Sequence, residues 1–373
     1  MNWKKTYLSY AVASHPLLAI TQMILLDYFN LSEGAGSIFH VISVAAIMLP
    51  AIIIVFKIKT SLFIRVYFAV IILLAINSVL FSKNTPFMLT EALQFTLPIV
   101  IPCMFCILCV GDIRVFMQAV YKISWCFAVL LLFYVFLILT HRIVAENYSM
   151  YLGYASLLPM LVLYHKKTKY SLCAASSLLL YIIIWGNRGA AVAGLLYIFY
   201  DVTTIYGKKI VVVVGLAFSV LIASLESIVV FLSGYGIESR TINKMAYGGF
   251  DESEGREMVY TKMIKVLENN QAGIGLWGDR TYLDGSWSHN LILEVLLDFG
   301  VVLGCIILLF FFYRIIHTFV KCKLPERKLL FLFFCSSIIP LMLSNSYLRD
   351  YKFGIFLGVL FLLNRKRTIS SRS

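Results

Sequence analysis

Four short polar groups interrupt an otherwise strongly apolar sequence. The first three contain glycine and an arginine, and the fourth contains a histidine and an asparagine and precedes a carboxylic acid. In chain order they are Trp185-Gly186-Asn187-Arg188-Gly189-Ala190, Ser253-Glu254-Gly255-Arg256, Gly273-Ile274-Gly275-Leu276-Trp277-Gly278-Asp279-Arg280, and Ser288-His289-Asn290. Arginine is always charged, and its planar fork matches a phosphate group. The first three groups are therefore candidates for binding an anion.

Arg188 is the first of these candidates. It lies in a tight reversal between two apolar runs, on the side of the membrane where the charge pattern described below disfavours basic residues. A guanidinium beside a helix N-terminus suits phosphate, although the side chain could instead extend to lipid headgroups. The glycines from Gly273 onward permit tight turns and close approach of the backbone to a ligand. No strand precedes them, so they do not form a dinucleotide site.

His289 begins an apolar run that contains Asn290, Glu294 and Asp298 at four-residue steps. This spacing places the last three on one face of a helix. Charged residues within a membrane span face the protein interior and mark function, although His289 could be merely interfacial. No set of His, Cys, Asp and Glu has the spacing of a metal site. The sequence therefore predicts neither a metal nor another cofactor.

These polar groups must be positioned by apolar helices. The 373 residues are 61% apolar and 14% charged, whereas a soluble domain is nearer half apolar and a quarter charged. Helices satisfy their own backbone in a bilayer and need about 20 apolar residues to cross it. We expect an all-α fold, a polytopic bundle of about twelve membrane-spanning helices that forms a single transmembrane domain over 1–373. The expected spans are 7–26, 36–56, 61–81, 91–110, 116–140, 150–165, 171–186, 188–206, 209–232, 290–312, 329–346 and 352–363.

The distribution of lysine and arginine predicts the orientation. With the N-terminus in the cytoplasm, every segment assigned to the cytoplasm carries basic residues, as the positive-inside rule requires. The C-terminus then also lies inside. The net charge of +13 reflects this bias and does not indicate nucleic-acid binding. The short loops on the outer side hold Lys83, Arg142, Arg188, Arg349 and Lys352.

One connection is much longer than the others, the polar segment 233–289, which we expect outside the cytoplasm. Loops of this length are usually functional or disordered. Within it, apolar residues from Val259 to Leu267 recur at helical spacing after a run of acidic residues. This pattern predicts an amphipathic helix that ends at Asn269-Asn270 and lies near the membrane surface.

The ordered set of motifs resembles the O-antigen polymerase and O-antigen ligase superfamily. The motifs span about 188–304, and the succession of spans covers the whole chain. The first five expected spans carry no matching motif. The matching residues are Gly-Asn-Arg-Gly-Ala at 186–190, Gly255-Arg256 at a helix start, Gly273-Ile274-Gly275, and Ser288-His289-Asn290 followed by Glu294, Gly300 and Gly304.

This resemblance implies a glycosyltransferase of the bacterial cytoplasmic membrane. Its donor would be a glycan on undecaprenyl diphosphate, used without a nucleotide sugar or a metal. The resemblance implies that Arg188 and Arg256 hold the diphosphate and that His289 is the base for the acceptor hydroxyl. Arg280 has no firm counterpart in the family and is added as a substrate-binding candidate because it stands in the same loop; Asn290 and Glu294 are added beside His289. A chain-length regulator and a flippase of the same pathway are candidate partners, besides the lipid bilayer.

The motifs favour a polymerase that moves the growing chain onto a newly flipped repeat unit, making capsule, exopolysaccharide or O-antigen. A ligase that transfers the finished glycan to lipid A–core or to a protein shares the donor chemistry and stays open. A transporter of the same lipid is a second alternative. Transporters often show internal repeats and charges near the midplane, whereas here no repeat is found and the polar residues cluster at the outer face. The candidates for stacking on sugars, or for an interfacial aromatic belt, are Tyr247, Trp277, Tyr282 and Trp287.

Overall fold

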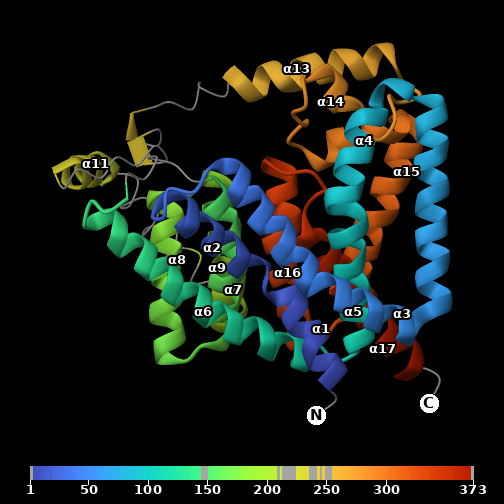
Figure 1. Ribbon diagram of the computed structural model, residues 1–373. Helices are drawn as coiled ribbons and strands as arrows, with labels where there is room; N and C mark the ends of the chain where they lie inside the picture. Colours follow the sequence, from blue (N-terminus) through green and yellow to red (C-terminus); the bar gives the residue numbers. More distant parts are fainter. Residues whose placement is uncertain are drawn as a thin grey trace. The chain divides into compact units, whose positions relative to one another are not determined.

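The computed structural model describes residues 3–143, 150–207, 211, 224–234, 242–243, 246–247 and 254–370. Every element in these parts of the chain is helical (Figure 1), which confirms the all-α prediction. The elements are α1 (Trp3–Ala13), α2 (His15–Asp27), α3 (Glu33–Leu80), η1 (Ser82–Asn84), α4 (Thr85–Glu91), η2 (Ala92–Val100), α5 (Ile101–Val110), α6 (Ile113–Leu139), α7 (Met150–Lys166), α8 (Lys169–Ile184), α9 (Arg188–Tyr206), α11 (Leu225–Gly234), α13 (Glu254–Asn269), α14 (Gly278–Tyr282), α15 (Leu291–Lys321), α16 (Leu324–Leu343) and α17 (Tyr351–Ser370).

Several helical stretches are long and apolar enough to cross a membrane. A further span is present if α1 and α2, which are bent by 46° at the break between them, count as one. The chain is thus a helical membrane protein, and its described residues contain fewer separate spanning helices than the expected set of about twelve. The five stretches are Gly34–Leu80, Ser82–Val110, Ile113–Leu139, Arg188–Tyr206 and Leu291–Lys321.

Local features account for the lower number. The expected spans 36–56 and 61–81 lie in one helix of 48 residues, α3, which is interrupted by non-helical backbone at Lys59. α8 is only 16 residues long, and α16 carries three charged residues in its first turns, at 326–328. Most of the expected span 209–232 lies outside the described residues.

The long helices leave apolar faces uncovered. On α15, Val302, Leu309 and Phe310 remain 75%, 72% and 65% exposed. A large uncovered apolar face is unfavourable in water, but it is the surface that a spanning helix offers to lipid. The exposed apolar side chains therefore agree with a membrane environment.

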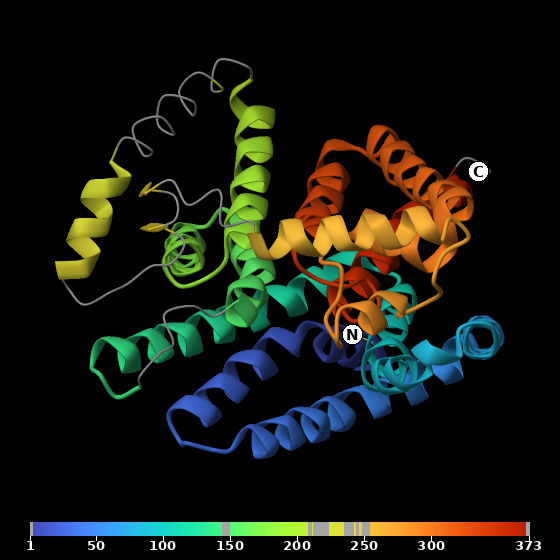
Figure 2. The same cartoon turned by 90° about the horizontal axis from the view of Figure 1, so that it is seen from above.

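The chain divides into two compact units, each made of segments that are distant in sequence. The first unit contains 1–12, 48–115 and 253–373, and the second contains 13–47 and 116–252. Figure 2 shows the same helices from above. Of the predicted site residues, Arg188 belongs to the second unit and all the others belong to the first.

α13 is the expected helix of the long connection, and it lies above α14 and α15 in the view of Figure 1. Met263 is buried together with Ile274 and Leu297, and the rest of the apolar stripe packs around these three side chains. The helix and its end at Asn269 are confirmed. The apolar stripe packs against side chains of the first unit, and the position of the helix near the membrane surface stays a prediction.

α15 is interrupted at Gly300, where φ is +78°. At this interruption some backbone N–H and C=O groups of α15 have no partner within the helix. Two of them form hydrogen bonds with the backbone of the loop that contains Gly273 and Gly275. Ile274 N–H donates to the Leu297 carbonyl oxygen at 2.7 Å, and Val301 N–H donates to the Gln271 carbonyl oxygen at 2.9 Å. The glycines therefore allow the loop backbone to approach the backbone of α15 closely.

Gly273→Ala is expected to destabilise the protein by about 1–3 kcal/mol more than Gly285→Ala, because a side chain forced into a packed region costs about that much. Gly273 has φ of +93°, and a Cβ there would lie 2.5 Å from the Gly300 nitrogen. Gly285→Ala is the matched control, because its φ is +89° but its nearest neighbour, Phe87 Cε1, is 3.5 Å away. The thermal unfolding midpoint of the detergent-solubilised variants measures both effects. Equal midpoints for the two variants would contradict the close contact between Gly273 and α15.

Candidate functional site

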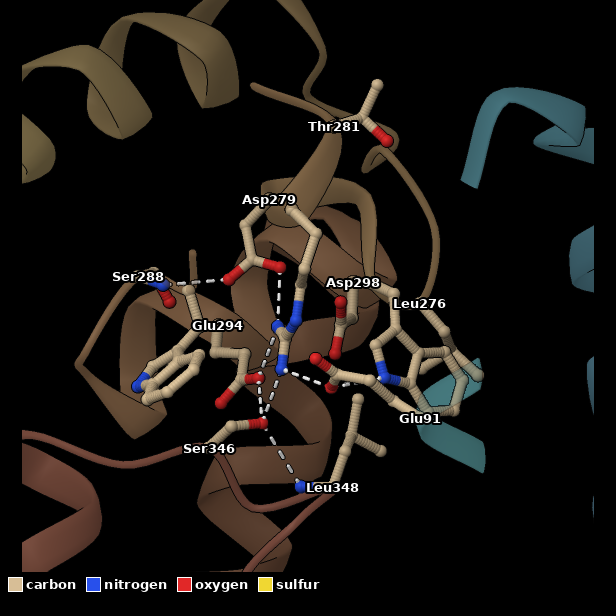
Figure 3. A network of polar contacts seen from close by, with 12 residues as sticks. Glu91, Leu276, Asp279, Thr281, Ser288, Glu294, Asp298, Ser346 and Leu348 are labelled. Carbon is tan, nitrogen blue, oxygen red and sulfur yellow. Dashed lines mark hydrogen bonds and ion pairs between the residues drawn. The ribbon is translucent and has the colours of Figure 1, made fainter. Parts of the chain in front are cut away.

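Arg280 lies at the centre of a buried ionic network in the first unit, and Figure 3 shows the carboxyl groups around it. Its Nη1 donates to Asp279 Oδ1 at 2.6 Å and to Glu294 Oε1 at 2.9 Å. Its Nη2 donates to Ser346 Oγ at 2.7 Å and to Glu91 Oε2 at 3.3 Å. The side chains of Arg280, Asp279 and Glu294 are completely buried. Residues from four separate segments are thus joined through one guanidinium.

The network fixes the charge of Arg280. Burial by itself would lower the pKa of Arg280, but the carboxylates of Asp279, Glu294 and Glu91 raise it above its ordinary value. The guanidinium is therefore the cation that neutralises these acids, and among the described residues no group of three or more His, Cys, Asp or Glu side chains could hold a metal ion. Removing such a cation from its partners is costly. The geometry favours an internal role for Arg280 and Glu294 over the substrate contact that we expected from the sequence.

Two buried asparagines hold the loop that carries Arg280. Asn77 Oδ1 accepts a hydrogen bond from the Leu276 N–H at 2.7 Å. Asn84 Nδ2 donates to the Ile274 carbonyl oxygen at 2.7 Å. Buried backbone groups need such partners, and here side chains supply them. The loop backbone is therefore held by contacts that are separate from the network of Arg280.

Trp277 belongs to the same buried region. Its side chain is completely buried, and its Nε1 donates to Glu91 Oε2 at 3.0 Å. The backbone of Trp277 has φ of +59°, just before α14 begins. The indole orients a carboxylate of the network and has no open face on which a sugar could stack.

The acids of α15 face the protein interior, as their spacing predicts. Asp298 lies one turn beyond Glu294 and is also buried. Its Oδ2 accepts a hydrogen bond from the Tyr347 hydroxyl at 2.6 Å. Asn290 has a different task, because its Oδ1 accepts from the N–H groups of Ile292 and Leu293 at 3.0 and 3.2 Å. Asn290 is thus the N-cap of α15, and its predicted contact with substrate stays a prediction.

His289 is fixed at the start of α15 by a backbone carbonyl group. Its Nδ1 lies 2.9 Å from the Ser344 carbonyl oxygen, and since a carbonyl oxygen only accepts, Nδ1 carries the proton. Nε2 then keeps its lone pair and can accept a proton. His289 also has φ of +55°, a strained conformation for a residue with a side chain and one that clusters at functional sites.

The pKa of His289 is lowered from its ordinary value. Burial is the largest cause, and the nearby positive charge of Arg256 lowers the pKa further, whereas the hydrogen bond to the Ser344 carbonyl group raises it. The imidazole is therefore neutral near pH 7, the protonation state that a general base requires.

The charge of Arg256 acts on the His289 imidazole, and a shared site for the two residues stays a prediction. Tyr260, one turn beyond Arg256 on α13, places its hydroxyl 3.5 Å from the His289 carbonyl oxygen. Arg256 is exposed, so its guanidinium is open to a ligand. The first unit thus contains an open cation and a neutral imidazole at the N-terminal end of a membrane-length helix.

Arg188 is the first residue of α9, in the second unit, where the sequence places a helix N-terminus. Asn187 caps this helix, because its Oδ1 accepts from the Ala190 N–H at 2.7 Å and its Nδ2 donates to the Met150 carbonyl oxygen at 3.1 Å. Gly186 leaves no room for a side chain, since a Cβ there would lie 2.5 Å from a carbonyl oxygen of α8. The motif therefore holds Arg188, half-buried, at a helix N-terminus.

The structure adds residues that the sequence analysis did not single out. Glu91 and Ser346 enter the network of Arg280 from segments far away in the chain. Arg349, counted before only as a charge of an outer loop, lies with its Cζ 4.6 Å from the centre of the Trp287 ring. None of these residues stands in a motif, so only packing reveals them.

Comparisons with known proteins give no match: no protein-family model, no curated protein and no solved structure matches this chain.

Proposed function

We propose that this protein is a membrane glycosyltransferase that joins oligosaccharide repeat units carried on undecaprenyl diphosphate into a polysaccharide. The observation that carries the proposal is the neutral His289, which keeps Nε2 unprotonated beside the exposed Arg256 at the end of a membrane-length helix. This arrangement suits a base and an anion-binding group for a substrate that is part lipid and part glycan. Capsule, exopolysaccharide and O-antigen are products of this class.

The reaction assigns one task to each group. The acceptor hydroxyl loses its proton to His289 Nε2 as its oxygen forms a bond to the anomeric carbon of the donor sugar. The bond from that carbon to the diphosphate oxygen breaks, and the bonding electrons leave with the diphosphate. Such transfers pass through an oxocarbenium-like state. Arg256 stabilises the charge that develops on the leaving group, and the same task for Arg188 rests on the sequence resemblance alone.

The proposal includes an orientation in the bacterial cytoplasmic membrane. Both termini lie in the cytoplasm, about twelve helices cross the bilayer, and 233–289 lies on the outer side. The charge distribution supports this orientation, because each segment assigned to the cytoplasm is basic. His289 would then meet an acceptor that arrives from outside, while the diphosphate stays at headgroup depth.

Arg188→Lys and Arg256→Lys are each expected to lower polymer synthesis by about 10- to 100-fold, since a hydrogen bond to a charged group contributes about 1.5–3 kcal/mol. Lysine keeps the charge but cannot bind a diphosphate with a planar fork. Polymer length and amount would be measured on membranes that contain equal amounts of each variant. Arg142→Lys is the matched control, because Arg142 is an exposed arginine of another predicted outer loop. Normal polymer from both lysine variants would contradict the diphosphate role and favour simple contact with lipid headgroups.

A further inference from the structure

Arg349 lies between α16 and α17, against two aromatic rings of the first unit. Its Cζ is 4.5 Å from the centre of the Phe95 ring and 4.6 Å from the centre of the Trp287 ring. Both distances are within the range of cation–π attraction. The two rings therefore contact the guanidinium without accepting its N–H groups as a carboxylate would, so these groups stay available for hydrogen bonds.

Among the described residues, the N–H groups of Arg349 have few partners. The contact recorded between Arg349 and an acid is the 3.5 Å distance from Nη1 to Glu91 Oε1, at the limit of a hydrogen bond. The other carboxylate oxygen of Glu91 already accepts from Trp277 and Arg280. The side chain of Arg349 is 27% exposed, whereas that of Arg280 is completely buried. Arg280 thus uses both of its Nη atoms on buried partners, although its Nε has no partner among the described residues. Arg349 has a single long contact with an acid and keeps donors available for a ligand.

Arg349 is also close to the candidate base. The Trp287 ring, which contacts Arg349, lies with its centre 5.2 Å from the centre of the His289 ring. Trp287 Nε1 donates to the same Ser344 carbonyl oxygen that accepts from His289, at 3.1 Å. One indole ring therefore separates the two side chains, and one carbonyl group fixes both the indole and the imidazole.

We propose that Arg349, held by Phe95 and Trp287, is a further binding residue for the diphosphate of the lipid-linked donor. This inference rests on the proposed function, because it names the group that the same site recognises. A guanidinium fixed by aromatic faces loses little conformational entropy when it forms a bidentate pair with phosphate. It would place the leaving group within reach of the sugar whose acceptor His289 activates.

The test is binding of farnesyl diphosphate, a short lipid diphosphate, to the purified full-length protein in phospholipid-free detergent. Arg349→Gln is expected to weaken this binding by about tenfold or more, the loss of a charge-assisted bidentate contact. Arg349→Lys keeps a charge near Glu91 and is expected to weaken binding severalfold. Arg142→Gln, the matched loss of an exposed arginine, is expected to bind as the wild type does. Wild-type affinity in both Arg349 variants would overturn the inference and leave the proposed function standing.

The same experiment separates ligand binding from a purely structural role. If Arg349 only neutralises Glu91, the double variant Glu91→Gln/Arg349→Gln should recover the farnesyl diphosphate affinity, and that result would overturn the inference. The inference predicts that the affinity stays reduced in the double variant. Binding of phosphatidylglycerol should not depend on Arg349, and equal dependence would assign the site to bilayer headgroups instead. Failure of the wild-type protein to bind the lipid diphosphate would overturn the donor assignment itself.

Discussion

His289→Ala is expected to abolish chain growth and to leave single repeat units on the lipid carrier. General-base catalysis contributes about 100- to 10,000-fold, and the imidazole that supplies it is held in the required tautomer by the Ser344 carbonyl group. Protein level and diphosphate binding should change little, because the proposed function assigns that binding to arginines and not to His289. The products would be measured as a ladder of glycan lengths on membranes from cells that make the repeat unit.

Two variants sharpen this prediction. His289→Asn keeps polarity but has no atom that accepts a proton at neutral pH, so it should be as inactive as alanine. His141 is the matched control, because it is an exposed histidine with nearly the same backbone conformation, φ +54° against +55° for His289. His141→Ala should make normal polymer. Long polymer from His289→Ala would remove His289 as the base and direct attention to the buried acids of α15.

The pH dependence of the reaction follows from the lowered pKa of His289. Protonation removes the lone pair of Nε2, so the base is active above its pKa and inactive below it. Because that pKa lies below the ordinary value of about 6.5, the rate should be flat through neutrality and fall only below pH 6.5. An acid limb centred above pH 6.5 in the wild-type enzyme would contradict the environment that we describe for His289.

Arg280→Met is expected to destabilise the protein by about 3–5 kcal/mol, the cost of breaking a buried ion pair by removing one partner. Methionine fills much of the volume but leaves Asp279, Glu294 and Glu91 without their common cation. The expected result is a large fall in the yield of folded protein and in its thermal unfolding midpoint. Arg280→Lys should lower the yield and the thermal unfolding midpoint less, because lysine keeps the charge but not the forked set of hydrogen bonds.

The control for Arg280 is Arg142→Met, which removes an exposed arginine and should leave the free energy of unfolding within about 0.5 kcal/mol of the wild-type value. If Arg280→Met is as stable as the wild type and loses only diphosphate binding, the network is not structural. Arg280 would then regain the substrate role that its place in the long loop suggested.

The sequence predicts well those features that depend on nearby residues. The start of α9 follows from Asn187 and Arg188, because an N-cap satisfies the first free N–H groups of the helix directly after it. The course of α13 follows from the helical spacing of its apolar residues. The inward position of Glu294 and Asp298 follows from their four-residue step.

The features that the sequence could not predict depend on contacts between distant segments. Glu91 is separated from Arg280 by 189 positions, and no local pattern indicates that they meet. The glycines at 273 and 300 could serve a ligand or a neighbouring backbone, and the packing of the loop against α15 decides for the backbone. Arg349 has no motif at all, and only the rings of Phe95 and Trp287 distinguish it from an ordinary loop arginine.

The most direct test of the proposed function is reconstitution of the purified protein in liposomes with a lipid-linked repeat unit as the sole glycan. The wild-type protein should produce a ladder of longer lipid-linked glycans and release undecaprenyl diphosphate, whereas His289→Ala should leave the single unit unchanged. Transfer only to an added lipid A–core acceptor would show a ligase instead. Movement of unchanged units across the bilayer without chain growth would show a transporter and contradict the assignment of His289 as a catalytic base.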